Sequence, residues 1–585
     1  AESAFDEGIL TPPVKIVEND VVRKDIEALY LRSSRKPEMV ALDFRAQLAG
    51  NMTAKTRIKA LIDRYGAKTV KSVMKKVIDN SEAAFLSKLK KIPDGVWRDR
   101  TYVEACRPGD RRTHRVQIAL TKKGDKLIFD NEGTAPQDGA MNATYSGWRG
   151  SVMVAINELL SWDQYFAVGG ALRHIEFDPV PGTLNCADFP ASVSTAPTQS
   201  MEISLYPAYN IISKMLYSDE ELRQDIMGIG GTSQWPTTIF RGIDQWGERY
   251  GYILIDPIGG SIGAFAQGDG INTGGQARTP IGQLPNVEHN EQLFPLLFLY
   301  RKELPDSGGA GKFRGGLSAE SCFIPHNTDF ITQDTLSSGN AIPTSTGMMG
   351  GYPSTTNAYT FIRESDIFQR MKESRLIEDS SEVAGNPQHL ELRQENFVQN
   401  SADVYAVRWS GGGGFGDPLQ RDIGRIVHDL EHLNITPKAA REIFGAVLDE
   451  NEHVDVAATE ENRNKIRKER LERLKNGQVP RDSHSGETAF PAGDNLAVYG
   501  SGDTARWGCA HCTADLGPIG ENFKDACLRD DRPVSDSNPL VGDPAVFIDD
   551  AVNFRLFYCP SCGNQIDNEI AVTSDAVLRD IELTV

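Results

Sequence analysis

The sequence predicts an α+β protein with a large mixed core, a helical extension and a C-terminal zinc ribbon. Apolar residues recur at helical spacing from Val70 to Ile78. β-rich segments at 115–120 and 126–130 flank a turn that contains glycine. Two Cys-x-x-Cys pairs lie in the last 80 residues. The expected parts are a core over 1–425, a helical extension over 426–480, a linker over 481–498 and a zinc-ribbon module over 499–585.

The chain is acidic and has an ordinary globular composition. Its 585 residues include 62 Lys and Arg against 81 Asp and Glu, a net charge of −19 that disfavours nucleic acid and anionic membranes. No apolar run approaches the ~18 residues of a membrane span, and no apolar signal core opens the chain. Most of the cysteines crowd near the C-terminus instead of spreading as pairs. We therefore expect a cytoplasmic protein that binds neither nucleic acid nor membrane.

An amphipathic helix with a basic side is expected near residue 70. Its apolar positions are Val70, Val73, Met74, Val77 and Ile78. Its opposite side carries Lys68, Lys71, Lys75 and Lys76. We interpret the lysines as a solvated helix face, the alternative being an anion-binding patch. Further helices are expected from Val152 to Leu160 and after Pro207.

Two helices are expected in the extension. Thr436-Pro437 fits an N-cap followed by proline at the first helical position, which predicts a helix through Val447. Thr459 is expected to cap a second, basic helix that ends at Asn476-Gly477. This basic helix is interpreted as a solvated linker or as a docking helix for an acidic partner.

The C-terminal cysteines form the most specific pattern. Each Cys-x-x-Cys turn brings two thiolates together, and two such turns supply the four ligands of a tetrahedral zinc site. The expected ligands of a structural Zn²⁺ ion are Cys509, Cys512, Cys559 and Cys562. The alternatives are a redox pair or disulfides. Cys527, between the two pairs, is either a spare buried thiol or a substitute ligand.

Glycine dominates between residues 228 and 278 and returns in two runs, at 307–316 and 410–418. Such loops let the backbone approach a ligand or another backbone closely. Neither run is expected to bind ATP. The first lacks the Gly-Lys-Ser/Thr ending of a phosphate loop, and the second lacks the strand-to-helix setting of G-x-G-x-x-G. Asp306 and Arg314 are expected to organise the first loop.

The same runs carry a family resemblance. Residues 304–317, Leu-Pro-Asp-Ser-Gly-Gly-Ala-Gly-Lys-Phe-Arg-Gly-Gly-Leu, resemble the R-P-D-S-G-G-A-G-x-x-R-G-G-x signature of the hydantoinase B/oxoprolinase family. Residues 412–422 resemble its G-G-G-x-G-D-P-x-x-R-D ending, and residues 435–445 resemble its S-P-E-A-A-x-x-x-Y-G-V tail. With weaker matches from Glu7-Gly8 onward, the resemblance covers about residues 5–450. It implies that the expected core over 1–425 is hydantoinase-B-like.

The resemblance also implies a division of labour between subunits. The family includes ATP-dependent hydantoinases, 5-oxoprolinase and ketone carboxylases, in which a hydantoinase-A-like partner binds ATP. ATP is therefore expected to be bound by partner subunits. In the family a His-His-Ala-Asp-x-Gly-Gly segment precedes the region that matches residues 7–15. That segment is expected either to have been removed or to be supplied by a separate small subunit.

A zinc module after residue 490 is similar to what ketone carboxylases carry. The resemblance thus implies the hydantoinase-B-like subunit of a carboxylase of the acetophenone carboxylase type, with bicarbonate and a small ketone as substrates. Partner subunits are expected to form carboxyphosphate and an enol phosphate, and this subunit to shelter carbon–carbon bond formation. The alternatives are a subunit of an ATP-dependent hydantoinase or 5-oxoprolinase, and a non-catalytic scaffold that docks the ATPase subunits.

Bond formation of this kind requires a dry pocket, donors for an oxyanion and a general base. The residues expected to transfer protons are Glu288 and His289, which lie where the family has Pro-x-Glu. The expected polar donors are Asn142 and Gln199, of which Asn142 lies where the family has Gly-Pro-x-Asn-Ala. A Glu beside a His is also typical of a surface pair, which is the alternative for residues 288–289.

Overall fold

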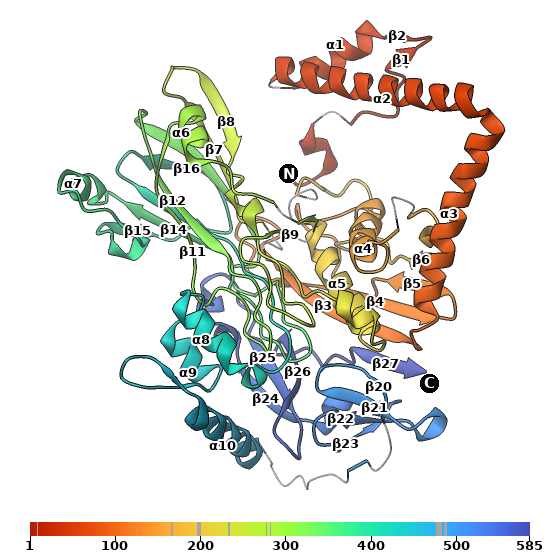
Figure 1. Cartoon of the computed structure of the whole chain (residues 1–585). Helices are drawn as coiled ribbons and strands as arrows, with labels where there is room; N and C mark the ends of the chain where they lie inside the picture. Colours follow the sequence, from red (N-terminus) through yellow and green to blue (C-terminus); the bar gives the residue numbers. More distant parts are fainter. Residues whose placement is uncertain are drawn as a thin grey trace.

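The computed structural model describes residues 1–8, 10–34, 36–164, 168–195, 200–231, 235–276, 278–280, 282–474, 483–484 and 488–584. Its helices and mostly antiparallel sheets confirm the predicted α+β class (Figure 1). A helical arm stands out from a centre of three sheets, and the C-terminal module packs below that centre (Figure 1). Within the described ranges, no helix combines the length and the apolar character needed to cross a bilayer.

A five-stranded sheet organises the N-terminal half. Its order is β27-β3-β4-β5-β6, and every pair is antiparallel except β5 with β6. The strands are β3 (Asp94–Glu104), β4 (Thr113–Lys123), β5 (Lys126–Asp130), β6 (Ile175–Asp178) and β27 (Ile581–Thr584). The expected hairpin is confirmed, because β4 and β5 pair across a turn in which Gly124 has a φ of 59°.

Two helices, α4 (Tyr145–Leu159) and α5 (Glu202–Leu216), pack on each other, and α5 packs on β3 and β4. Both begin before the residues at which the sequence places them. Every residue of α5 is buried, with Pro207 inside the helix. Proline removes one helical hydrogen bond there. Burial of the whole, mostly apolar helix outweighs that local cost, a balance that local propensity does not reveal.

Two further antiparallel sheets pack face to face. Their orders are β11-β12-β17-β14-β15 and β16-β13-β7-β8. The strands of the first are β11 (Leu296–Glu303), β12 (Ala319–Pro325), β14 (Ala358–Arg363), β15 (Asn386–Gln388) and β17 (Val404–Arg408). Those of the second are β7 (Thr237–Ile243), β8 (Arg249–Ile253), β13 (Phe330–Leu336) and β16 (Arg393–Asn400). One aromatic-rich cluster, which includes Phe240, Phe323 and Tyr405, fills the space between them. Short helices α6 (Val287–Leu293) and α7 (Ile367–Lys372) lie in connections.

Five glycine-containing segments meet at one place, which we call the glycine crossing. It comprises residues 228–231, 260–275, 307–316, 346–351 and 410–416. Backbone bonds join the segments directly: Gly309 donates to the Gly412 carbonyl at 2.8 Å, and Gly413 donates to that of Ile229 at 2.9 Å. A Cβ on Gly315 would lie 1.9 Å from the Gly412 oxygen. The glycines of these runs therefore bring backbone against backbone.

Charged residues fasten the glycine crossing at its edge. Asp269 accepts two hydrogen bonds from the Arg421 guanidinium, at 2.7 and 2.9 Å, and one from the backbone N–H of Arg314 at 2.7 Å. Asp306 accepts from the backbone N–H and the hydroxyl of Thr436, at 2.9 and 2.7 Å. Asp306 and Arg314 thus organise the 307–316 loop, and the loop is tied to the helical extension.

The extension contains three helices, α8 (Ile423–Glu431), α9 (Pro437–Glu442) and α10 (Val456–Leu474). The N-cap prediction is confirmed, since the Thr436 hydroxyl accepts from the Ala439 N–H at 3.1 Å. Helix α9 is shorter than predicted, because Gly445 adopts a φ of 67° and turns the chain into β18 (Val447–Leu448).

Two predictions for α10 are wrong. Thr459 does not cap the helix, which begins at Val456; its buried hydroxyl accepts a hydrogen bond from the Val447 N–H at 2.9 Å. Nor is α10 a solvated linker. Arg470 is buried, and its guanidinium lies 4.4 Å from the centre of the Tyr558 ring. Long arginine stems allow a basic helix to pack in this way.

The C-terminal module consists of two antiparallel sheets. One contains β20 (Thr488–Pro491), β21 (Leu496–Tyr499), β22 (Arg506–Cys509) and β23 (Asp515–Pro518). The other contains β24 (Leu528–Pro533), β25 (Val552–Tyr558) and β26 (Gln565–Val572). β20 and the start of β21 lie inside the stretch expected as a linker, and β27 pairs with β3 of the N-terminal sheet. The boundaries at 425, 480 and 498 stay predictions.

Buried charges join this module to the rest of the chain. Lys214 of α5 lies 2.6 Å from Asp580, and Lys524 lies 3.1 Å from Asp567 and 3.2 Å from Asp580. All four side chains are buried. Burial opposes the charge of Lys214, but the two aspartates outweigh it and raise the pKa of the lysine. A buried charge left without its partner is costly, so this cluster fixes how the module is placed.

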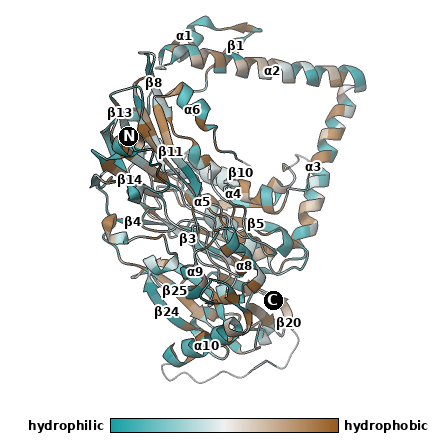
Figure 2. Ribbon diagram, turned by 60° about the vertical axis from the view of Figure 1, so that its left-hand side comes forward, coloured by the Kyte–Doolittle hydropathy of each residue, from teal (hydrophilic) through white to brown (hydrophobic). Residues whose placement is uncertain are grey.

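The N-terminal arm is formed by α1 (Lys24–Arg32), α2 (Pro37–Tyr65) and α3 (Ala67–Leu89), and Figure 2 shows α2 and α3 standing away from the body. The four lysines expected on a solvated face are exposed. On the apolar side of the same segment Val73, Met74 and Val77 are exposed, whereas Val70 and Ile78 are half-buried. The remaining short strands are β1 (Val17–Glu18), β2 (Val21–Val22), β9 (Gly275–Gln276), β10 (Thr279–Pro280) and β19 (Val454–Asp455).

Gly315→Ala is expected to destabilise the protein by at least about 4 kcal/mol, because the new Cβ cannot avoid the Gly412 carbonyl. Thermal unfolding and the yield of folded protein measure the effect. Gly268→Ala is the matched control, since its Cβ meets no atom within 4 Å. It should change stability by less than about 0.5 kcal/mol. Equal melting temperatures for the two variants would contradict backbone-on-backbone packing.

The Asp269 carboxylate is expected to contribute acid-sensitive stability. Burial opposes its ionisation, but Arg421 outweighs burial and lowers the pKa of Asp269 to about 2. A carboxylate whose pKa is depressed on folding stabilises the protein above its unfolded pKa, near 4, and loses that effect as the pH falls toward 2. Asp269→Asn should therefore cost about 2 kcal/mol at pH 7. The difference from the parent protein should shrink between pH 4 and pH 2. Asp503→Asn, at an exposed site, serves as control.

Candidate functional site

The four predicted cysteine ligands converge. The sulfur atoms of Cys509, Cys512, Cys559 and Cys562 all lie within 4.8 Å of one another. The Cys509 and Cys562 sulfurs are 3.8 Å apart, and those of Cys512 and Cys559 are 3.5 Å apart. Tetrahedral zinc with bonds of about 2.3 Å separates its sulfur ligands by about 3.8 Å. The cluster therefore has the dimensions of a zinc ribbon.

The two knuckles that present these cysteines have the same backbone geometry. Cys509 donates its N–H to the Ala514 carbonyl at 2.9 Å, and its own carbonyl accepts from Thr513 at 2.9 Å. In the second knuckle Cys559 donates to Asn564 at 2.8 Å and accepts from Gly563 at 3.0 Å. Thr513 and Gly563 both have positive φ, 59° and 73°. Each turn thereby folds back so that its two sulfurs point to the same side.

The arrangement fits a structural metal rather than a reactive thiol. Four cysteine ligands fill a tetrahedral shell and leave no position for a substrate. Cys509 and Cys559 belong to a core cluster that also contains the buried Trp507 and Phe523. Cys527 lies outside the four-cysteine group, and its thiol donates to the Phe523 carbonyl at 3.4 Å. It is thus a buried thiol and not a substitute ligand.

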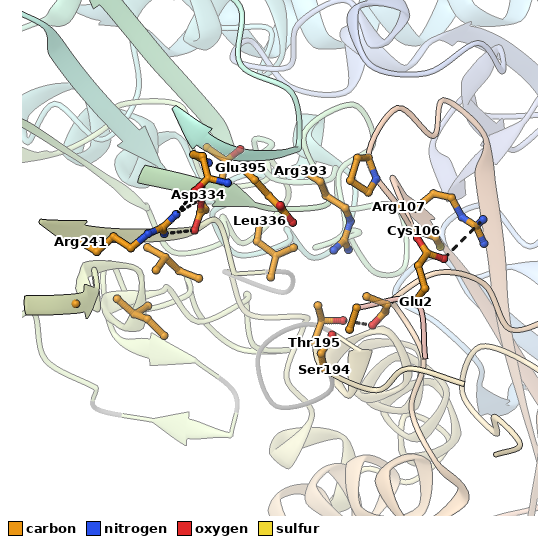
Figure 3. Close-up of a pocket in the computed structure, with 18 of the residues that line it drawn as sticks. Glu2, Cys106, Arg107, Ser194, Thr195, Arg241, Asp334, Leu336, Arg393 and Glu395 are labelled. Atoms are coloured by element: carbon orange, nitrogen blue, oxygen red, sulfur yellow. Dashed lines mark hydrogen bonds and ion pairs between the residues drawn. The ribbon is translucent and has the colours of Figure 1, made fainter. Parts of the chain in front are cut away.

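A cavity of about 940 Å³ lies between the two face-to-face sheets, which we call the sandwich, and the N-terminal part of the chain. Its polar wall comes from β7, β13, β16 and the loops around residues 106–108 and 194–195, and its apolar wall includes Ile239, Tyr252 and Leu336 (Figure 3). Such mixed walls, mostly apolar with a few convergent polar groups, are typical of sites for small molecules.

Charged side chains of both signs line this wall, namely Arg107, Arg241 and Arg393 together with Glu2, Asp334 and Glu395. Arg241 of β7 pairs with Asp334 of β13. Figure 3 shows the Arg393 guanidinium directed into the space between Leu336 and Cys106. Burial lowers the pKa of Arg393 to about 10, so the group stays cationic at neutral pH. A planar guanidinium suits carboxylate and phosphate oxygens.

Cys106, at the cavity wall, lies with Asp110 and His114 in a group that the sequence did not single out. His114 Nε2 is 2.7 Å from the Asp110 carboxylate, which also accepts from the backbone N–H of Cys106 at 3.2 Å. Burial raises the pKa of the Cys106 thiol to about 12. A neutral buried thiol is a poor nucleophile, so this group holds the loop after β3 in place.

The predicted donor Asn142 uses its side chain on the backbone. Its amide donates to the Gly139 and Ser192 carbonyls, at 3.0 and 2.8 Å, and its oxygen accepts from the Asp138 N–H at 2.9 Å. Both amide hydrogens are therefore occupied. Asn142 holds together two loops that line the cavity, while its role as a donor to a substrate stays a prediction. Gln199 lies outside the described residues.

The predicted proton-transfer pair lies elsewhere. Glu288 and His289 occupy the first turn of α6, where the Asn286 side chain caps the backbone N–H of His289 at 3.1 Å. Both side chains are exposed, and neither is among the described residues that line the cavity. This exposed position matches the alternative interpretation of Glu288 and His289 as a surface pair. Their role in proton transfer stays a prediction.

Comparison with known proteins divides the chain into two matches. Residues 1–418 match the family model of hydantoinase B/oxoprolinase, and residues 485–585 match that of the acetone carboxylase gamma subunit. The second match contains all four cysteines of the cluster.

Curated relatives agree with the first match. The chain is 26% identical over 474 residues to the acetophenone carboxylase delta subunit of Aromatoleum aromaticum, a match that covers 77% of this chain and 67% of that protein. It is 24% identical over 480 residues to a putative D-/L-hydantoinase subunit of a Pseudomonas species, with 79% and 74% covered.

A solved structure extends the likeness to the fold. The nucleotide-free structure of acetone carboxylase matches with a TM-score of 0.73 and 20% identity, over 82% of this chain and 66% of that one. The chain thus spans about two thirds of the length of this relative and of the acetophenone carboxylase subunit.

The purified protein is expected to carry one zinc ion per chain, measured by elemental analysis. Cys559→Ser should lose the ion and lower the melting temperature, because metal binding stabilises a folded ribbon directly. Cys527→Ala is the matched control and should keep the zinc. Full zinc content in Cys559→Ser would contradict a role for this cysteine as a ligand. A disulfide between cysteines of the cluster, detected as a bond that reductants break, would contradict the zinc site.

Proposed function

Because the chain belongs to the hydantoinase B/oxoprolinase family, we propose that it is a subunit of an ATP-dependent ketone carboxylase, of the acetophenone carboxylase type. In this proposal the chain houses the formation of a carbon–carbon bond between an activated ketone and activated bicarbonate. Hydantoinase-A-like partner subunits use the ATP.

One observation carries the proposal. A hydantoinase-B-like core and a module like the acetone carboxylase gamma subunit occur in the same chain. The core alone is compatible with hydrolysis of a ring amide, as the similarity to a hydantoinase subunit illustrates. The gamma-like module favours carboxylation. The four-cysteine cluster of this module supports folding through structural zinc and takes no part in the chemistry.

The cavity supports the same chemistry. The proposed intermediates, carboxyphosphate and an enol phosphate, are anionic, and the buried guanidinium of Arg393 is directed into the cavity, whereas Arg241 is already paired with Asp334. The apolar wall suits the carbon skeleton of a ketone and limits water, which hydrolyses carboxyphosphate. Loss of phosphate from carboxyphosphate leaves CO₂, and hydrolysis of the P–O bond of the enol phosphate by one water releases a second phosphate and the enolate. The enolate carbon then attacks CO₂, and the new carbon–carbon bond gives the carboxylate of a 3-oxo acid.

The chain's own residues divide the remaining tasks. Asn142 fixes the loops around Ala140 and Thr195 that form part of the wall. The buried Arg393 brings a fixed positive charge to where the carboxylate product forms. Glu288 and His289 keep their proposed role in proton transfer, and direct variants test this role.

A complex reconstituted from this chain and its ATPase partners should hydrolyse ATP only when bicarbonate and a methyl ketone are both present. It should also incorporate ¹³C from bicarbonate into a 3-oxo acid. Arg393→Lys keeps the charge but loses the planar fork, and should lower kcat/KM at least about tenfold. Arg249→Lys, which lies outside this cavity, is the matched control.

Other outcomes identify the alternatives. ATP hydrolysis stimulated by a cyclic imide without bicarbonate would identify a hydantoinase or oxoprolinase subunit instead. Full carboxylation by the partners in the presence of the C-terminal module alone would identify a scaffold. Unchanged turnover in Glu288→Gln and His289→Ala would remove these residues from proton transfer and leave the carboxylase proposal standing.

A further inference from the structure

Helices α2 and α3 form an angled arm with little support from the body. They meet at Gly66, whose φ of 81° makes the bend and whose Cβ position faces open space. Figures 1 and 2 both show α2 and the first half of α3 away from the sheets. The second half of α3 returns to the body, where Phe85 and Leu89 are fully buried.

A single apolar stripe runs along α3, and only its second half is covered. Met74 lies on the same helical face as Phe85 but is 62% exposed, and Val77 and Val73, toward one side of that face, are 44% and 55% exposed. Where α3 contacts the body, its apolar residues Phe85 and Leu89 are buried against it. Beyond the edge of the body the helix stays apolar but has no covering surface, as is typical of a protein–protein interface.

Helix α2 repeats the pattern. Ile58, Leu61 and Tyr65 recur at helical spacing near its C-terminal end, and all three are exposed. Isolated apolar side chains on a surface are ordinary, but exposed apolar stripes on two consecutive helices are not. Their burial on a partner would release water from a long apolar surface.

The charge of the arm narrows the choice of partner. Residues 52–78 contain eight Lys and Arg and one Asp, a local charge of +7 in a chain of −19, which leaves −26 on the remainder. Two arms packed on each other would bring like charges together. The acidic remainder of another molecule of this chain is complementary instead.

We propose that the arm docks on the acidic body of a second copy of this chain and so forms a homodimer by reciprocal arm exchange. The same contact, made twice around a two-fold axis, covers both arms. An anionic membrane is the less suitable partner. The −26 charge of the remainder would be repelled there, and residues 52–78 contain Tyr65 as their one aromatic residue. The proposal is independent of the proposed catalytic function.

The full chain alone should have twice its 64.3 kDa mass in light scattering coupled to gel filtration. Met74→Glu and Leu61→Glu place a charge in each stripe, and each should raise the dimer dissociation constant at least tenfold. Ser72→Glu adds the same charge to α3 on its exposed opposite side and should leave the constant within twofold. Far-UV circular dichroism verifies that the variants keep their helices.

Cross-linking of mixed ¹⁴N and ¹⁵N chains locates the contact. Lysines 68 and 71 should link to acidic residues of the body in peptide pairs of mixed isotope, formed with a carboxyl-to-amine reagent. A monomer at every concentration overturns the proposal. So does a dimer that is unaffected by both stripe variants, or one cross-linked only from arm to arm. Binding of the monomer to vesicles of anionic lipid would assign the arm to a membrane instead.

Discussion

Direct contact of backbone with backbone at the glycine crossing is the constraint on which the rest of the structure depends. Carbonyl groups of residues 410–416 lie where a Cβ on Gly315 or Gly351 would have to be, and the Tyr352 carbonyl lies where a Cβ on Gly309 would have to be. Side chains therefore cannot hold these segments apart, and backbone hydrogen bonds hold them together. The sandwich, the N-terminal sheet and the extension meet there, so the distances between them are set by peptide groups and not by adjustable rotamers.

Charge pairs then fix the parts that surround the crossing. Arg421, fully buried, joins Asp269 to Asp429, and Lys214 and Lys524 join α5 to the C-terminal module through Asp567 and Asp580. Such buried charge pairs contribute less to net stability than to a unique arrangement, because any other placement of these segments would leave a buried charge without its partner. The zinc-ribbon module is thereby part of one core with the N-terminal sheet, as the shared cluster of Trp97, Leu205 and Trp507 also indicates.

The cavity is a consequence of this framework. Its wall combines residues more than 200 positions apart in sequence, from Cys106 to Arg393, and each comes from an element placed by the crossing or by its neighbours. The four cysteines, by contrast, stand in two local turns, and none of them is among the described residues that line the cavity.

The sequence by itself determined the α+β class, the β4–β5 hairpin, the Thr436 cap, the convergence of the four cysteines and the family, because each depends on short spacings that local geometry converts directly into structure. Only the tertiary structure decided that Thr459 supports β18 and that Asn142 holds two loops together. It also decided that Glu288 and His289 lie at the surface, and that the first half of the apolar stripe of α3 is exposed to solvent. These outcomes depend on which surfaces meet across the glycine crossing and the sheets. Periodicity along one helix shows that a face is apolar but not what lies against it.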